Sequence, residues 1–454
     1  MATATNIQDL RVAMGGDVLE PGDPAYDDVR AVQNGMIDRR PAVIARCLGS
    51  ADIATAVQFA RAHDLEIAVR GGGHNVAGRS VCDDGLMIDL SLMRAVLVDP
   101  VRKTAIAQGG ATWGDVNRET QLHGLATTGG VVSTTGVGGL TVGGGLGWLM
   151  GSYGLTVDNL LSAEVVTASG EVIRASESSH PDLFWAIRGG GGNFGVVSAF
   201  EFQLHPVGPM VVAGFVAHPI EAAPEVLRFY REYTANAPDE LTAFAALLYA
   251  PDDPSIQLAA IVACHSGSVE EGEAVVRPLK EFGSPVLDII QPMPYAVLNT
   301  LLDDSAPKGG LNYWKSNYLE ELTDEAIDTM VEQFRSCPSP LGSALIEHFH
   351  GAATRVAPDA TAFPHRREGY NFLVAGLWLD PRETDANVAW TRAMHDAMRP
   401  FMASGQYSNY QDEPEPEGTG SGAYGENYAR LQAVKAQYDP ENVFHLNVNV
   451  QPAK

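Results

Sequence analysis

Short apolar runs alternate with glycine-rich turns over the first 205 residues, and this pattern predicts short strands and helices. Residues 41–47 and 66–70 are expected to be strands. Residues 50–63 between them carry apolar side chains at helical spacing, with Ser50 as the expected N-cap. This strand–helix–strand order predicts that the two strands are parallel.

Two further pairs of apolar runs are joined by turn dipeptides, which predicts two hairpins. One joins 95–99 to 103–108 through an Asp-Pro turn, and the other joins 161–168 to 171–175 through a Ser-Gly turn. The same reasoning predicts strands at 86–90 and 194–204 and helices at 112–123 and 181–188.

Beyond residue 206 glycine clusters become fewer, and alternating helical and strand patterns predict a second α+β domain over about 210–400. Its expected elements are helices at 221–233 and 324–334 and strands at 241–249, 257–264, 343–351 and 370–379. The last part of the chain is expected to form a solvated loop at 411–421, a helix at 424–438 and a strand at 443–450.

The charge balance narrows the choice of partners. Asp and Glu total 56 against 30 Lys and Arg, so the formal net charge is −26. A surface this negative repels phosphate backbones and anionic lipids, which disfavours nucleic-acid and membrane binding. The apolar stretch 131–153 is too rich in glycine, serine and threonine for a membrane span. Residues 1–10 lack the basic start and apolar centre of a signal peptide, so a cytoplasmic protein is expected.

The sequence offers no recognisable metal site. The four cysteines form no CxxC pair and are expected to be core residues without a disulfide framework. No HxH or HExxH pattern surrounds His74, the histidine inside the first glycine cluster.

Three glycine clusters, at 70–78, 136–147 and 189–195, each lie next to an expected strand. Glycine lets backbone amides approach a phosphate closely and adopt positive φ. Three such clusters in one half of the chain favour binding of a large anionic cofactor over simple tight turns. The first cluster does not fit GxGxxG between a strand and a helix, and no GxxxxGK[ST] lysine is present, which disfavours NAD and ATP.

The residues around these clusters resemble a known family. Residues 69–78, VRGGGHNVAG, resemble the FAD-linking loop of the vanillyl-alcohol oxidase superfamily, and most closely that of its berberine-bridge-enzyme-like branch, which includes bacterial oxidases. Residues 135–147, continued by 153–159, are similar to the second FAD loop, and residues 190–197 to the adenine-side segment. Later landmarks of the family are matched in order by 362–366, 407–410, 427–431 and 438–444, so the likeness covers about the whole chain.

The resemblance implies an α+β protein of two domains. A PCMH-type FAD-binding domain with two α/β subdomains would comprise residues 1–205. A substrate domain with an antiparallel sheet would comprise 206–404, and residues 405–454 would return to the FAD domain. The active site would lie where the two domains meet.

The resemblance also implies that FAD is bonded through its 8α-methyl group to His74. Many relatives have a second link through a cysteine, but Val132 occupies that position here, so a single link and a small substrate are expected. The other residues expected to contact FAD are Arg70, Gly71, Gly72, Gly73, Asn75, Val76, Ala77, Gly78, Ser133, Thr134, Thr135, Gly138, Gly139, Thr141, Val142, Gly195, Val196, Val197, Asn447 and Asn449.

Oxidation at FAD needs a group that removes a proton from the substrate. Active-site tyrosines of the family make Tyr407 and Tyr410 the leading candidates, unless they merely pack at the domain boundary. A tyrosine base needs a nearby cation or donor, for which Lys315, Arg355 or the flavin is available. Tyr313 and Asn371 are further catalytic candidates, and Glu347, His348 and His350 are expected on a strand that borders the cavity. Arg355 occupies the position of a carboxylate base found in some relatives.

The expected function is therefore an FAD-dependent oxidase that passes a hydride from a small alcohol, amine or alkaloid-like substrate to FAD and then to O2, giving H2O2. Thr135 occupies a position where a small side chain in relatives admits O2. Carbohydrate oxidation at the anomeric carbon, a dehydrogenase with another acceptor, and a flavin-binding protein without turnover remain alternatives. The expected partners are the substrate and O2, and the protein is expected to be a monomer or a homodimer.

Overall fold

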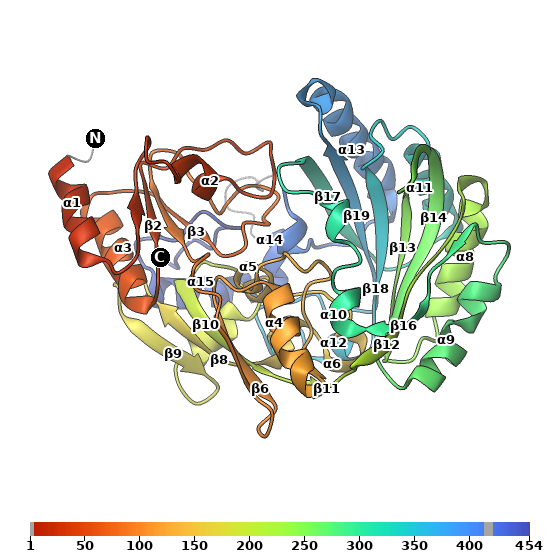
Figure 1. The fold of residues 1–454 in the computed structure, drawn as a ribbon, viewed down its shortest axis with the longest axis horizontal. Coiled ribbons are helices and arrows are strands. Elements are labelled where there is room, and N and C mark those ends of the chain that lie inside the picture. The colour runs from red at the N-terminus through yellow and green to blue at the C-terminus, as the bar shows by residue number, and fades with distance from the viewer. Residues whose placement is uncertain (1–3, 413–420) are drawn as a thin grey trace.

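The computed structural model describes residues 4–412 and 421–454 and has the α+β class that was expected. Its strands form two groups on opposite sides of the molecule (Figure 1). A four-stranded and a five-stranded sheet come from the first half of the chain. The other group is an eight-stranded antiparallel sheet between residues 210 and 378.

The four-stranded sheet has the order β1-β2-β4-β3, with β1 (Val18–Leu19), β2 (Val43–Arg46), β4 (Leu86–Asp89) and β3 (Ile67–Arg70). Both β2 and β3 pair in parallel with β4, which confirms the expected parallel arrangement. Helices α1 (Ala4–Ala13) and α3 (Ser50–Ala62) pack on this sheet. The expected N-cap is wrong: Gly49 takes that position, and the Ser50 hydroxyl donates to Glu164 instead.

The five-stranded sheet has the order β5-β6-β10-β8-β9, and all its neighbouring strands are antiparallel. Its strands are β5 (Val96–Asp99), β6 (Thr104–Gln108), β8 (Leu160–Val166), β9 (Val172–Ser176) and β10 (Val196–Gln203), which confirms both hairpins. Helix α4 (Trp113–Thr120) begins at Thr112, whose side chain accepts the amide hydrogen of Asp115. Helix α7 (Pro181–Ile187) begins with proline, which is pre-set for a first helical turn.

The eight-stranded sheet runs β15-β12-β14-β13-β18-β19-β17, with β16 also paired to β12. Four helices cover one of its faces (Figure 1), and a large apolar core fills the space between them and the sheet. The strands are β12 (Met210–Pro219), β13 (Leu241–Ala250), β14 (Asp253–His265), β15 (Leu287–Asp288), β16 (Gln291–Pro294), β17 (Leu311–Leu319), β18 (Ser343–Phe349) and β19 (Gly369–Trp378). The helices are α8 (Ala223–Thr234), α9 (Val269–Glu281), α11 (Asp324–Phe334) and α13 (Thr384–Met398).

The helices at α8 and α11 and the strands β13, β14, β18 and β19 were expected, whereas β12, β17, α9 and α13 were not. The apolar run of β12 is interrupted by Gly214, and α9 contains both Gly272 and Pro278. These local signals against regular structure are overcome by packing, because α9 covers β12 and β14.

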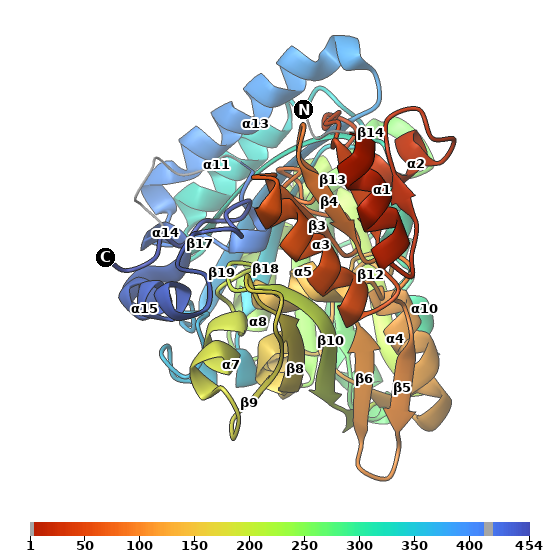
Figure 2. The ribbon, with the colours of Figure 1, turned by 90° about the vertical axis from the view of Figure 1, so that its left-hand side faces the viewer.

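The C-terminal part returns to the first half of the molecule. Helix α15 (Tyr428–Tyr438) follows α14 (Ser421–Tyr424) and packs against α7 (Figure 2). The expected strand at 443–450 is wrong, because side chains rather than strands hold this segment: Lys435 Nζ donates to the carbonyl of Phe444 at 2.9 Å, and the Tyr424 hydroxyl donates to that of Val448 at 2.7 Å. Most of the expected loop, residues 413–420, lies outside the described residues. The domain limits at 205 and 404 stay a prediction.

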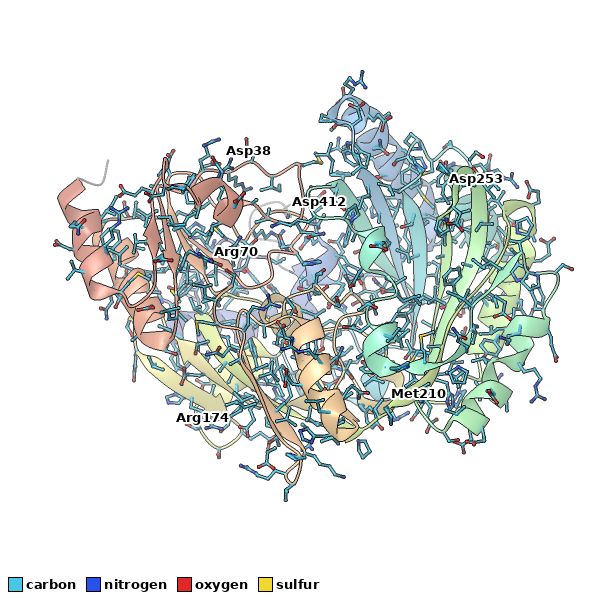
Figure 3. All side chains as sticks on the ribbon, in the orientation of Figure 1. Asp38, Arg70, Arg174, Met210, Asp253 and Asp412 are labelled. Atoms are coloured by element: carbon cyan, nitrogen blue, oxygen red, sulfur yellow. The ribbon has the colours of Figure 1, made fainter. Side chains whose placement is uncertain are left out.

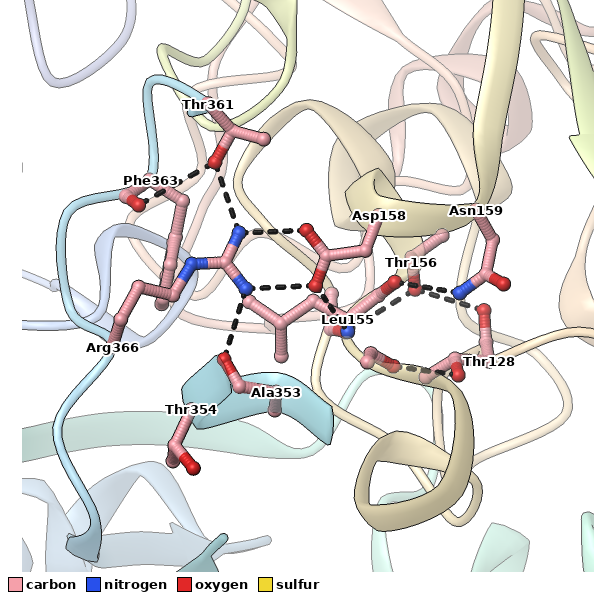
Figure 4. Close-up of polar contacts among 12 residues, drawn as sticks. Thr128, Leu155, Thr156, Asp158, Asn159, Ala353, Thr354, Thr361, Phe363 and Arg366 are labelled. Carbon is pink, nitrogen blue, oxygen red and sulfur yellow. Dashed lines mark hydrogen bonds and ion pairs between the residues drawn. The ribbon is translucent and has the colours of Figure 1, made fainter. Parts of the chain in front are cut away.

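An ion pair between Arg366 and Asp158 joins the two groups of elements (Figure 4). Both guanidinium NH₂ groups donate to the carboxylate at 2.7 Å, and the Arg366 side chain is only 1% exposed. The same guanidinium donates to the Ala353 carbonyl and to the Thr361 hydroxyl, and Asp158 also accepts the amide hydrogen of Leu155. This network holds the segment between β18 and β19 against residues 153–159, which follow the second glycine loop.

The remaining helices and strands are short: α2 (Tyr26–Arg30), β7 (Leu125–Ala126), α5 (Val137–Val142), α6 (Met150–Tyr153), β11 (His205–Pro206), α10 (Tyr295–Leu298) and α12 (Ala352–Arg355). The apolar stretch 131–153 forms α5, α6 and loops. Over residues 4–412 and 421–454, no helix is long and apolar enough to cross a bilayer. Among the same residues, no cluster of three or more His, Cys, Asp or Glu could hold a metal ion.

Candidate active site

A cavity of about 970 Å³ lies between the glycine loops and one face of the eight-stranded sheet. Backbone from all three glycine clusters lines one half of it. A side chain at Gly139 would meet no protein atom within 4 Å, so this position opens directly onto the cavity. The glycines on the wall are Gly71, Gly72, Gly73, Gly136, Gly138, Gly139, Gly191, Gly192 and Gly195.

The first two glycine loops touch backbone to backbone. A Cβ atom at Gly72 would lie 2.5 Å from the Cα and N atoms of Gly136, and one at Gly136 would lie 2.4 Å from the N atom of Gly72. Side chains are therefore excluded where the loops meet, and bare amides form the wall. Such a wall fits an extended cofactor that carries phosphates.

Replacing Gly72 with alanine is expected to weaken FAD binding roughly 10- to 100-fold, because the loops must separate to admit the methyl group and such overpacking costs about 1–3 kcal/mol. The measurement is a fluorescence titration of FAD with both variants in a His74→Ala background, so that only reversible binding is followed. Gly49→Ala is the matched control, since its Cβ would meet nothing within 4 Å. Equal affinities for the two variants would contradict this role of Gly72.

The expected cofactor residues divide into two sets. Arg70, labelled in Figure 3, lies behind the wall, where its guanidinium pairs with the buried Asp89 at 2.9 Å. Ser133 binds Asp303, and Thr134 binds His74. The expected residues that line the cavity are Gly71, Gly72, Gly73, His74, Asn75, Thr135, Gly138, Gly139, Val142, Gly195, Val196, Val197 and Asn447. Those that do not are Arg70, Val76, Ala77, Gly78, Ser133, Thr134, Thr141 and Asn449.

His74 lies on the cavity wall, and its Nε2 atom is 2.9 Å from Thr134 Oγ1. Burial lowers the pKa of this imidazole to about 4, although the carboxylate of Asp303 opposes the shift. The ring is therefore neutral at neutral pH, and a neutral ring nitrogen carries the lone pair that a bond to carbon requires. Val132 also lines the cavity, whereas the four cysteines are all buried elsewhere.

The opposite half of the cavity is one face of the eight-stranded sheet. Successive residues of a strand point to opposite faces, so Ser343, Leu345 and Glu347 of β18 line the cavity. His348 lies on the same strand, as expected, whereas His350 lies just beyond its end. Neither side chain lines the cavity, and His350 Nε2 is hydrogen-bonded to the carbonyl of Leu241.

Among the described residues of the eight-stranded sheet, Glu347 is the one carboxylate that lines the cavity, and two side chains bind it. The Asn371 amide donates to Oε2, and the Tyr410 hydroxyl donates to Oε1 at 3.1 Å. Burial raises the pKa of Glu347 to about 7, since the carboxylate is only 5% exposed and these two donors offset part of its desolvation. Asn371 is fully buried behind Glu347, so it does not touch the cavity.

Of the cation or donor expected beside a tyrosine base, the structure provides donors to Tyr407 and an acidic neighbour to Tyr410. Burial raises the pKa of Tyr407 to about 12, and its hydroxyl oxygen accepts hydrogens from the Gly145 amide and the Asn409 side chain. Burial and the neighbouring Glu347 raise the pKa of Tyr410 well above its ordinary value. Neither tyrosine is prepared to ionise by itself. Both line the cavity, and their rings meet edge to face with centroids 4.9 Å apart.

The cations considered for this role lie elsewhere. Arg355 pairs with the exposed Asp239, and Lys315 Nζ lies 5.6 Å from the ring centre of Tyr313. Tyr313 itself lies on the α13 side of the sheet, where Arg392 Nε donates to its hydroxyl at 2.9 Å. Its neighbour Trp314 lines the cavity instead, because strand residues alternate between the faces.

The rest of the sheet-side wall is mostly apolar. Trp314 meets the Tyr410 ring edge to face at 5.9 Å. The other apolar side chains on this wall are Phe215, Phe244, Leu248, Val262, Leu345, Leu373, Ala375 and Leu377. The carboxylate of Glu347 thus lies in a mostly apolar wall that faces the glycine loops across the same cavity.

Comparison with known proteins identifies the family. Residues 41–176 match the FAD binding domain, and residues 406–451 match the family described as berberine and berberine like. The chain is 32% identical to (R)-6-hydroxynicotine oxidase of Paenarthrobacter nicotinovorans over all of this chain and 98% of that protein. The protein belongs to the berberine-like FAD-linked oxidoreductases. It is also 32% identical to an FAD-linked oxidoreductase of Dictyostelium discoideum, over 88% of this chain and 86% of that one.

Solved structures of this family agree with the fold. A crystal structure of 6-hydroxy-D-nicotine oxidase from Arthrobacter nicotinovorans superposes with a TM-score of 0.89 at 29% identity, covering 97% of this chain and 99% of that one. A chitooligosaccharide oxidase has a TM-score of 0.86 at 23% identity and shares the fold. As a berberine-like oxidoreductase, the protein uses FAD, and the glycine-lined half of its cavity is the part that fits this cofactor.

Sequence reasoning placed Glu347 on the right strand but did not single it out. A signal was available, because Glu347 is in phase with the inward residues Ser343 and Leu345 and is the one acidic residue of that face. Arg355, expected at the position of a carboxylate base found in some relatives, lies beyond the end of β18 on the short helix α12.

Proposed function

We propose that the protein is an oxidase that removes a hydride from a small, mostly apolar amine or alcohol and uses O2 as the final acceptor, releasing H2O2. The observation that carries this proposal is the Tyr410–Glu347 pair, which lies on an apolar wall facing the glycine-lined half of the same cavity. When bound, FAD supplies the hydride acceptor. The chain's own task is to hold the substrate against it and remove a proton.

The proton leaves through Tyr410 and Glu347. Because the Tyr410 hydroxyl gives its hydrogen to Glu347, its oxygen lone pairs remain free to accept a hydrogen from a substrate O–H or N–H group. As that proton is taken, Tyr410 can pass its own to Glu347. The final acceptor then has a pKa of about 7, which suits general base catalysis near neutral pH far better than an isolated tyrosine does.

The apolar wall supports the substrate class. A sugar has a hydroxyl on nearly every carbon, and each buried hydroxyl without a partner costs free energy. Beside Glu347 and Tyr410, the sheet-side wall is formed mainly by phenylalanine, leucine, valine and tryptophan. A ring- or alkyl-bearing molecule with a single amine or hydroxyl meets this wall at lower cost, so we favour it over a carbohydrate.

Covalent attachment of FAD to His74 is part of the proposal. It is supported by the neutral imidazole on the cavity wall and by its place at the end of the first glycine loop. With Val132 in the cavity wall, we expect one covalent bond rather than two. Thr135, whose small side chain also lines the cavity, leaves room for O2 and supports the oxidase over a dehydrogenase.

Acid precipitation of the purified protein is expected to leave a yellow pellet, and His74→Ala is expected to release all flavin into the supernatant. Absorbance spectra of the two fractions make the measurement. A colourless wild-type pellet would contradict the covalent bond.

Oxygen consumption with panels of aromatic amines, alcohols and oligosaccharides then tests the reaction. Turnover of a ring-bearing amine or alcohol with stoichiometric H2O2 supports the proposal. Turnover of oligosaccharides alone, or substrate-dependent bleaching of the flavin that O2 does not reverse, would point to a carbohydrate oxidase or to a dehydrogenase.

A further inference from the structure

The loop that carries Ser133 and Thr134 is held from across the molecule. Asn299, which follows α10, donates to the carbonyl of Gly130 at 2.7 Å. Asp303 accepts two hydrogens from Ser133, one from its amide at 2.8 Å and one from its hydroxyl at 2.5 Å. Both holding residues follow the first strands of the eight-stranded sheet in sequence, about 170 residues after the loop they bind.

The other side of this loop rests on α4. The amide of Trp113 donates to the carbonyl of Thr135, and that of Gly114 donates to the carbonyl of Ser133. The helix start therefore takes the loop's carbonyl groups, while Asp303 takes the amide and hydroxyl hydrogens of Ser133. The start of α4 and Asp303 together hold the backbone on either side of Thr134 and so fix the position of this residue.

Thr134 in turn contacts His74. Its hydroxyl is the hydrogen-bond partner of Nε2, which leaves Nδ1 as the ring nitrogen with no such contact among the described residues. The Thr134 side chain is exposed, so little packing holds its rotamer. The orientation of this side chain toward His74 therefore depends on the backbone that Asp303 holds. The charge of Asp303 also raises the pKa of His74.

We propose that Asp303 is a positioning residue for His74: through Ser133 and Thr134 it holds the imidazole in the orientation needed for covalent attachment of FAD, and so sets the rate of that attachment. This inference rests on the covalent bond of the proposed function. In the attachment a C–H bond of the 8α-methyl group is replaced by a C–N bond to His74. One proton leaves the carbon and one leaves the imidazole, and the electron pair left on FAD passes with two protons to O2 as H2O2.

The test follows covalent incorporation over time. The full chain is produced in riboflavin-limited cells, supplied with FAD in air, and sampled by acid precipitation. We expect Asp303→Ala to attach FAD at least tenfold more slowly than the wild type, with thermal unfolding midpoints and non-covalent FAD affinity unchanged. Thr134→Val is expected to show the same defect, because it removes the partner of His74 Nε2. Asp303→Asn, which keeps the shape and a hydrogen-bond acceptor, is expected to recover part of the rate.

Asp304→Asn is the matched control. It removes the same charge one residue away, from an exposed side chain that lines the cavity but makes no hydrogen bond or ion pair in the part of the chain that the structure describes. Wild-type attachment rates in both Asp303→Ala and Thr134→Val would overturn the inference. If Asp303→Ala does not fold, Thr134→Val alone decides. A colourless pellet from the wild type would instead overturn the covalent bond itself, so the two failures are distinct.

Discussion

Glu347→Gln is expected to lower kcat by about 10²- to 10⁴-fold, the usual contribution of a positioned general base. Glutamine keeps the size of the side chain and can still accept a hydrogen from Tyr410, but it cannot take up the proton. Tyr410→Phe is expected to lower kcat by a similar factor, because it removes the hydroxyl that links the substrate to Glu347. Steady-state oxygen consumption with the best substrate of the screen measures both variants.

The pH profile separates a base from a residue that only shapes the cavity. Since Glu347 acts as a carboxylate and its pKa is raised to about 7, kcat/KM of the wild type is expected to rise with pH and reach half its plateau near pH 7. The Gln variant should lose this limb. Glu320→Gln, which affects an exposed partner of Arg367, is the control and should retain it. A Gln variant with the wild-type profile would contradict the role of Glu347.

Folding stability provides an independent check with a defined sign. The folded state holds the Glu347 proton more tightly than the unfolded state, because burial raises the pKa from the ordinary glutamate value of about 4.3 to about 7. The resulting stabilisation is complete below the unfolded value and is lost as pH rises through about 7. Glutamine has no proton to lose, so its unfolding midpoint at pH 8 should not fall below that of the wild type. A loss of activity in the Glu347→Gln variant would then reflect the missing general base and not a less stable fold.

Arg366→Met is expected to lower the free energy of unfolding by about 3–5 kcal/mol, because it leaves the carboxylate of Asp158 buried without its cation. Asp158 is 9% exposed at its side chain, and of its hydrogen-bond partners among the described residues only the Leu155 amide would remain. The Ala353 carbonyl would lose a charged donor as well. Urea unfolding followed by tryptophan fluorescence measures the effect.

The next residue offers a matched control. Arg367 is 87% exposed at its side chain and pairs with the exposed Glu320, so Arg367→Met is expected to change stability by less than about 1 kcal/mol. The double variant Arg366→Met with Asp158→Asn should recover part of the loss, since no unpaired charge is left buried. Equal costs for Arg366→Met and Arg367→Met would show that the pair in Figure 4 contributes little beyond a surface contact.

Local sequence determined the elements with strong local signals. The parallel unit around α3, the two hairpins, and α11 at 324–334 follow from apolar periodicity and turn residues, which act over a few neighbours in the chain. The glycine clusters likewise indicated a cofactor site, because accessible backbone amides and positive φ are properties of glycine itself. The segment at 443–450 shows the limit: its alternation is that of a strand, but it pairs with no strand among the described residues, and Lys435 and Tyr424 hold its backbone instead.

The tertiary structure decided which of these residues form the site. Alternation along β18 separates Glu347 from His348, but it does not say which face meets the cofactor loops; that depends on how the eight-stranded sheet packs on the first half of the chain. Burial raises the pKa of Glu347, and the two donors that oppose this shift, Asn371 and Tyr410, lie 24 and 63 residues away in the sequence. Asp303 reaches the loop that carries Ser133 and Thr134 across 170 residues of sequence. Such contacts join residues that are far apart in the sequence. Local sequence patterns therefore determine the helices, strands and turns, whereas tertiary packing determines which side chains meet and how their pKa values shift.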